Sequence, residues 1–92
     1  MSNLTPETLE KRAIKQYLTL KGYFHFPLLQ GLASYKGLPD IMAIKKNKVY
    51  TVEVKKKGGK QSQHQKNFQE DWEAHGGVYI CGNIDEVINT MK

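Results

Sequence analysis

Asp40, Glu53 and Lys55 are the three polar residues whose types and spacing best suit chemistry. Asp40 follows Pro39 and opens one run of strand-forming residues, while Glu53 and Lys55 stand two apart in the next run. Side chains two apart on a strand point to the same face of a sheet. If the two runs pair as an antiparallel hairpin, the start of the first lies beside the end of the second, so the three side chains converge.

Two carboxylates held a few ångströms apart repel each other unless a cation lies between them. Hard oxygen ligands without a cluster of His or Cys favour Mg²⁺ or Mn²⁺ over zinc. Such an ion can bridge a phosphate and lower the pKa of an attacking water. The ammonium of Lys55 can orient that water or neutralise the developing charge. The pattern therefore predicts metal-dependent phosphoryl chemistry.

Hydrophobic periodicity and capping signals predict the elements that must hold these residues. Ala13, Ile14, Tyr17 and Leu18 recur at helical spacing, and Ser62 with Gln65 fits a capping box. The expected elements are a helix over 5–21, strands over 23–26, 41–44 and 49–55, a helix from 62 to about 75, a strand over 78–81 and a closing helix capped near Asn83. The order α-β-β-β-α-β-α predicts one α/β domain over residues 1–92, with a central mixed sheet flanked by helices.

Composition narrows the range of partners and compartments. Fourteen Lys and Arg against nine Asp and Glu give a formal net charge of +5, which favours a polyanionic partner such as nucleic acid. The single cysteine, Cys81, excludes an intramolecular disulfide and is expected to be a buried thiol, which favours an intracellular, cytoplasmic setting. No apolar run approaches the ~18 residues needed to span a bilayer, so no membrane association is expected.

The ordered motifs resemble those of a known family. The segment Gly37–Asp40, a spacer of twelve residues and Glu53-Val54-Lys55 resemble the PD-(D/E)xK nuclease superfamily. Glu10, Gly22, Lys56, Gly58-Gly59 and the segment Ser62–Gln65 extend the likeness to its VRR-NUC branch, over roughly residues 7 to 80. This resemblance implies a restriction-endonuclease-like fold and a hydrolase that cuts DNA.

The resemblance also assigns roles residue by residue. It implies that Asp40, Glu53 and the backbone carbonyl of Val54 hold Mg²⁺ or Mn²⁺, with Glu10 as a further ligand directly or through water. Lys55 becomes the catalytic lysine, and Gln65 matches the glutamine that this branch carries after it. No small-molecule cofactor is implied. Short free-standing members of the branch act as homodimers on four-way DNA (Holliday) junctions, so a structure-selective junction resolvase is the expected function.

Several residues have a second interpretation. Glu7 is better explained as a helix-dipole residue, whereas Glu10 lies near the apolar face of its helix, where a solvated glutamate is out of place. The Ser62 capping box alone accounts for Gln65. Four lysines are expected to contact DNA, although solvated lysines near a sheet edge also serve to prevent aggregation: Lys36, Lys56, Lys57 and Lys60.

Three rival functions remain open. The chain could be a non-cutting DNA-binding module of the same fold, a nuclease that prefers flaps or plain duplex, or a basic assembly protein with a protein partner. The intact Asp40, Glu53 and Lys55 set speaks against the first of these. For a homodimer, the expected surface is the aromatic run Tyr23–Phe26 with Leu28 and Leu29, which is more apolar than an exposed loop requires.

Overall fold

A computed structural model describes residues 5–31 and 34–92. Its elements are α1 (Pro6–Leu20), β1 (Phe24–Pro27), β2 (Ile41–Lys45), β3 (Lys48–Val54), α2 (Gln63–Ala74), β4 (Val78–Gly82) and α3 (Ile84–Thr90). The predicted element order α-β-β-β-α-β-α is therefore confirmed, with each boundary close to its predicted position. Residues 32–33, within the loop predicted between Gln30 and Gly37, and residues 1–4 lie outside the described chain.

The four strands form one mixed sheet in the order β1-β2-β3-β4. β2 pairs antiparallel with β1 and with β3, and β3 pairs parallel with β4. Lys45 pairs with Lys48, so the hairpin loop has two residues, Lys46 and Asn47, with φ of 50° and 68°. Left-handed backbone at both loop positions is the type I′ geometry that matches the twist of paired strands. The loop is thus shorter than the four-residue polar insert suggested.

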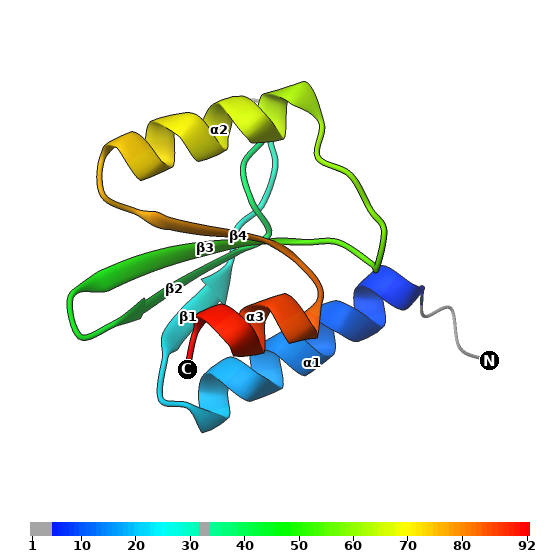
Figure 1. The fold of residues 1–92 in the computed structure, drawn as a ribbon, viewed down its shortest axis with the longest axis vertical. Coiled ribbons are helices and arrows are strands. Elements are labelled where there is room, and N and C mark those ends of the chain that lie inside the picture. The colour runs from blue at the N-terminus through cyan, green and yellow to red at the C-terminus, as the bar shows by residue number, and fades with distance from the viewer. Residues whose placement is uncertain (1–4, 32–33) are drawn as a thin grey trace.

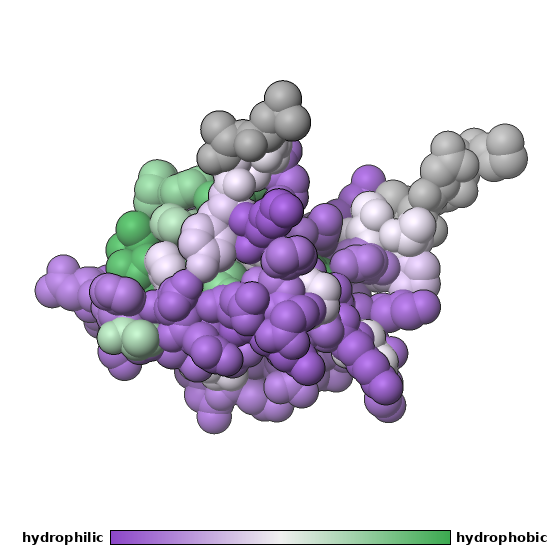
Figure 2. Space-filling model, turned by 90° about the horizontal axis from the view of Figure 1, so that it is seen from above, coloured by the Kyte–Doolittle hydropathy of each residue, from purple (hydrophilic) through white to green (hydrophobic). Residues whose placement is uncertain are grey.

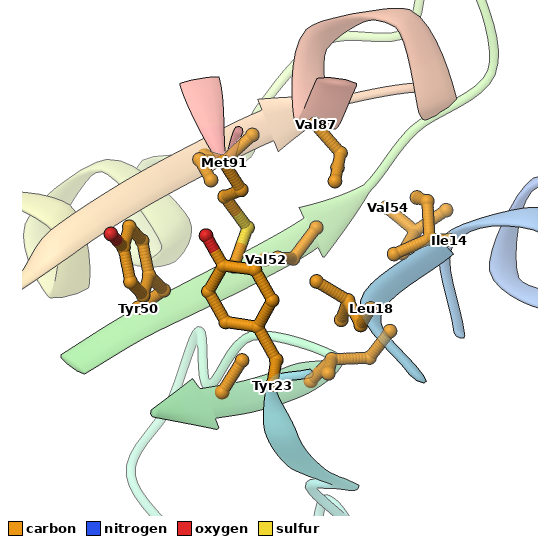
Figure 3. Packing of buried hydrophobic residues seen from close by; sticks show 11 residues of the cluster. Ile14, Leu18, Tyr23, Tyr50, Val52, Val54, Val87 and Met91 are labelled. Carbon is orange, nitrogen blue, oxygen red and sulfur yellow. The ribbon is translucent and has the colours of Figure 1, made fainter. Parts of the chain in front are cut away.

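Helices cover both faces of the sheet, with α2 on one side and α1 and α3 on the other (Figure 1). The main core lies under α1 and α3, where Ile14 and Leu18 of α1 meet Val52 and Val54 of β3 (Figure 3). Ile14 and Leu18 are one helical turn apart, so both point toward the sheet and both are fully buried. Each such side chain stabilises the fold by about 1.5–3 kcal/mol relative to exposure. The core thereby fixes β3, which carries Glu53.

The α2 face of the sheet is only partly covered. Phe68 stacks on Trp72 with ring centroids 5.6 Å apart and also packs near Tyr79 of β4. On the β1–β2 side, Phe24 is 68% exposed and Phe26 is 37% exposed. Figure 2, viewed from the α2 side, shows most of the apolar residues of a largely hydrophilic face gathered in one patch.

Two expectations about burial were wrong. Tyr23 was expected in an exposed aromatic surface but is 6% exposed, because it turns into the main core and packs edge-to-face on Tyr50. Cys81 was expected to be buried but is only partly so, since it stands near the end of β4, beside Gly82. In the described part of the chain, no helix is long and apolar enough to cross a membrane.

Candidate active site

Asp40 is held in place by the backbone on both of its sides. It immediately precedes β2, where its N–H donates to the carbonyl of Val52 (3.0 Å) and its carbonyl accepts from the N–H of Leu28 (2.8 Å). Its Oδ2 accepts a hydrogen bond of 2.7 Å from the N–H of Val54. Because Val54 follows Glu53, this bond ties the two predicted acidic residues together, as the hairpin argument required.

Glu53 is a buried acid with an unusual environment. It lies on β3 and is 5% exposed, and its Oε1 has no hydrogen-bond partner among the described residues. Its Oε2 is 3.9 Å from Nζ of Lys55. Burial, reinforced by the negative charge of Asp40, raises the pKa of Glu53 to about 8, although Lys55 lowers it. An ionised carboxylate is costly here without a further cation.

A second lysine reaches the site from α1. Nζ of Lys11 is 3.4 Å from Oδ1 of Asp40, so Asp40 is shared between an ammonium and a backbone N–H. Sequence reasoning missed Lys11. The available signal was its place next to Glu10, on the helix turn that was expected to face the carboxylates. The site therefore holds two lysines, Lys11 and Lys55, beside its two acids.

The sequence favoured Glu10 as a metal ligand and Glu7 as a helix-dipole residue, but the two side chains have other surroundings. Oε1 of Glu10 accepts a 2.8 Å hydrogen bond from the N–H of Ile84, the first residue of α3. Glu10 therefore caps α3, together with the side chain of Asn83. The charge of Glu7, by contrast, is among those that raise the pKa of Glu53. Its contribution is smaller than those of burial and of Asp40.

Gln65 and the loop before Asp40 meet at the start of α2. Gln65 forms the predicted capping box, in which its Oε1 accepts from the N–H of Ser62 (2.9 Å) and the hydroxyl of Ser62 accepts in return. A Cβ on Gly37 would lie 2.2 Å from the carbonyl oxygen of His64, so only glycine allows this contact. The close approach fixes the loop that leads to Asp40 against the helix that carries Gln65.

Of the four lysines expected to contact DNA, one lies in the loop before Asp40 and three lie in the segment after β3. Lys36 is exposed one residue before Gly37, and Lys56, Lys57 and Lys60 are exposed in the segment that follows β3. Lys56 and Lys57 line a hollow of about 200 Å³ with Lys55 and Glu86. None of the four forms an ion pair within the described ranges.

The donor set suits an oxygen-preferring divalent ion. No group of three or more His, Cys, Asp and Glu residues that could hold a metal is present in residues 5–31 and 34–92. The protein thus offers two carboxylates, Asp40 and Glu53, and the nearby carbonyl of Val54. Mg²⁺ commonly binds proteins through one or two carboxylates and keeps several waters. The unpartnered Oε1 of Glu53 is the atom that such an ion would satisfy.

Comparisons with known proteins identify the fold. No protein-family model matches the sequence, and no curated protein matches it. A solved structure described as a "VRR_NUC domain" superposes with a TM-score of 0.81 at 22% sequence identity, over 97% of this chain and 100% of that one. The chain therefore has the fold of a VRR_NUC domain, as the motif resemblance predicted.

Proposed function

We propose that this chain, with its VRR_NUC fold, is a metal-dependent endonuclease that hydrolyses phosphodiester bonds in DNA. The observation that carries the proposal is the buried Glu53 beside the half-buried Asp40, with one oxygen of Glu53 unpartnered and two lysines alongside. A purely structural acid in this position would have its oxygens satisfied by hydrogen bonds. The net charge of +5 supports an anionic substrate.

Each side chain has a distinct part in this mechanism. Asp40, Glu53 and the carbonyl of Val54 would hold Mg²⁺ or Mn²⁺, which when bound supplies charge for the phosphate and acidifies a water. Lys55 follows β3 directly, held by the bond from its N–H to the carbonyl of Gly82 (2.9 Å), and we expect its ammonium, 3.9 Å from Oε2 of Glu53, to orient the attacking water or to neutralise the developing phosphorane charge. Lys11 adds a second positive charge near the phosphate, on the α1 side.

Gln65 has a supporting place in the proposal. Its Oε1 is engaged in the capping box, which leaves its amide group as the part that can donate to substrate or water. Oε1 of Glu10 is engaged with the N–H of Ile84, so Glu10 remains a candidate ligand through its second oxygen or through water.

The test is cleavage by matched variants. Labelled duplex, flap and four-way junction DNA are incubated with protein and Mg²⁺, Mn²⁺ or EDTA. We expect cutting with either ion, none in EDTA, and loss of cutting but retained binding for Asp40→Asn. Lys55→Ala should slow cutting by at least ~10²-fold. Cutting in EDTA, or by Asp40→Asn at the wild-type rate, contradicts the mechanism.

The same assay separates the rival functions. A protein that binds DNA in every condition but never cuts it is the non-cutting module. Preference for four-way junctions over flaps and duplex supports the junction resolvase, which rests on the resemblance in the motifs. A protein that binds none of these DNAs at moderate salt would favour the assembly protein, and both nuclease proposals would then fail.

We also propose that the chain works as a homodimer, since paired incision of a symmetric junction needs two sites. β1 is an edge strand of the described sheet, and Phe24 on it and Leu29 just after it are 68% and 81% exposed. Large exposed apolar side chains beside an open edge favour a second copy. Tyr23 is excluded from this surface by its burial.

Light scattering at micromolar protein measures the assembly. We expect about twice the 10.5 kDa chain mass. Phe24→Glu or Leu29→Glu should shift the mass toward monomer. Ile88→Glu is the matched control, since Ile88 is 40% exposed on α3, which packs against β4 at the opposite edge of the sheet. A monomeric wild type, or equal effects of all three substitutions, contradicts this dimer surface.

A further inference from the structure

A second basic feature lies at the hairpin end of the sheet, away from the carboxylates. A hollow of about 230 Å³ opens there, and its lining has no Asp or Glu side chain. The residues that line it are Tyr23, Lys45, Lys46, Lys48, Tyr50 and Lys92. We call it the hairpin hollow.

Two of its lysines have no other function in the described structure. Lys45 donates to the carbonyl of Lys21 (2.6 Å) at the end of α1 and lies over the ring of Tyr23, so its charge is already used. Lys46 and Lys48 are exposed and form no ion pair within the described ranges. Both are therefore available to an external anion.

The backbone at Lys46 is a second, independent observation. Lys46 occupies the first position of the two-residue loop with φ of 50°. Glycine is preferred at this position because it has no Cβ to crowd the next carbonyl oxygen, and asparagine and aspartate because their short polar side chains form local hydrogen bonds. A lysine held at a strained turn position points to a use for its charge rather than to turn formation.

The packed rings of the two tyrosines form the base of the hairpin hollow. Tyr23 and Tyr50 pack edge-to-face, with ring centroids 5.5 Å apart, and they lie at one end of the main core (Figure 3). Burial raises the pKa of Tyr23 to about 12, so its hydroxyl stays protonated. The hydroxyl of Tyr23 already donates to the backbone oxygen of Lys92 (3.5 Å), so the ammonium groups are the donors that suit a phosphate group.

The hairpin hollow and the carboxylate site face different directions. Lys48 and Glu53 are at opposite ends of β3, about 16 Å apart at the usual rise per residue. Tyr50 belongs to the core under α1 and α3, whereas Glu53, three residues on, points to the opposite face of the sheet. The molecule is 25 Å across its shortest axis. The hollow and Glu53 therefore lie toward opposite ends of β3 and on opposite faces of the sheet.

We propose that the hairpin hollow binds a backbone phosphate of a second DNA arm, while the carboxylate site holds the arm that is cut. This inference rests on the proposed nuclease function and deepens it, because it assigns the recognition of branched DNA to Lys46 and Lys48. DNA arms that diverge from a branch point reach both positions. The hollow then favours branched DNA over linear duplex through charge and placement alone.

The test compares salt dependence on two DNAs. The double variant Lys46→Asn/Lys48→Gln removes both free charges, and Lys15→Gln/Lys66→Gln removes two charges from α1 and α2 as the matched control. Binding to a four-way junction and to linear duplex is measured in EDTA over a salt series. Each phosphate contact contributes about −0.9 to the log–log slope. We expect the junction slope of the first variant to flatten by up to about 2, with an unchanged duplex slope.

Two further readouts separate this role from folding and from chemistry. Lys46→Asn should not lower the thermal midpoint, because asparagine suits the turn better than lysine. At saturating junction, kcat should stay at the wild-type value while KM rises. A lowered midpoint that accounts for the binding loss, or a fall in kcat alone, contradicts the proposal.

The remaining outcomes are equally decisive. An unchanged junction slope, or an equal change on linear duplex or in the control variant, overturns the second-arm assignment. Millimolar inorganic phosphate could raise the thermal midpoint of the wild type but not that of the double variant. If the two proteins then have equal salt slopes on each DNA, the hollow binds free phosphate instead of a DNA arm. If the wild type cuts DNA but any of these results is found, the second-arm inference is refuted and the proposed nuclease function is not. A wild type that binds no DNA refutes it together with the proposed function.

Discussion

Replacement of Glu53 by glutamine tests the electrostatics of the carboxylate site without reference to activity. The pKa of Glu53 is raised from its ordinary value of 4.5 to about 8, chiefly by burial and then by the charge of Asp40. A folded-state pKa above the unfolded value means that the folded protein binds the proton more tightly. Below about pH 4.5 Glu53 is protonated in both states and does not alter the free energy of unfolding. As the pH rises from 4.5 toward 8, the folded protein keeps the proton longer than the unfolded chain does, so the free energy of unfolding falls.

The size of that loss follows from the shift. At ~1.4 kcal/mol per pKa unit, the full shift corresponds to at most about 5 kcal/mol. Relaxation of the protein around the buried charge and penetration of water reduce the effect to roughly 1–3 kcal/mol. For a domain of this size, each kcal/mol moves the thermal midpoint by about 4–8 °C. Glu53→Gln keeps the shape of the side chain and removes the charge, so it should remove this pH-dependent loss.

The assay is thermal unfolding by circular dichroism at pH 5, 6.5 and 8 in EDTA. We expect Glu53→Gln to be close to the wild type at pH 5 and to unfold at a higher temperature at pH 8. Mg²⁺ should raise the midpoint of the wild type at pH 8 and leave the variant nearly unchanged. Glu73→Gln is the control, since Glu73 is exposed on α2. Parallel pH profiles for wild type and Glu53→Gln would show that Glu53 is ionised at little cost, and the reasoning from burial would be refuted.

Two further predictions concern α1. Lys11→Met removes an ammonium that competes with a divalent ion for Asp40, so the affinity for Mn²⁺ measured by calorimetry should rise, by up to about five-fold for an exposed ion pair worth no more than ~1 kcal/mol. An unchanged or weaker affinity would show that Lys11 does not occupy a ligand position. Glu10→Ala removes the cap on Ile84 and should destabilise the fold by about 1 kcal/mol in chemical denaturation, whereas Glu10→Gln keeps the acceptor oxygen and most of the stability. Equal losses for the two variants would contradict a capping role.

Local sequence signals were enough to predict the helices and strands and the approach of Asp40 to Glu53 and Lys55. Two-residue alternation placed Glu53 and Lys55 on one face of β3, and antiparallel pairing with β2 brought Asp40 beside them. The Ser62 capping box and the Asn83 cap also formed where the sequence placed them. These features depend on contacts within a strand pair or a helix turn, so neighbouring residues decide them.

Contacts between distant segments could be decided only by the tertiary structure. Glu10 caps α3 because packing brings Ile84, 74 residues away, within 2.8 Å of its carboxylate. The same packing places Lys11 on Asp40 and turns Tyr23 into the core rather than onto a surface. The hairpin hollow likewise joins Tyr23, the residue before β1, with the β2–β3 hairpin and with Lys92, the last residue of the described chain. Periodicity tells which face of an element is apolar, but it carries no information on which distant polar group that element will meet.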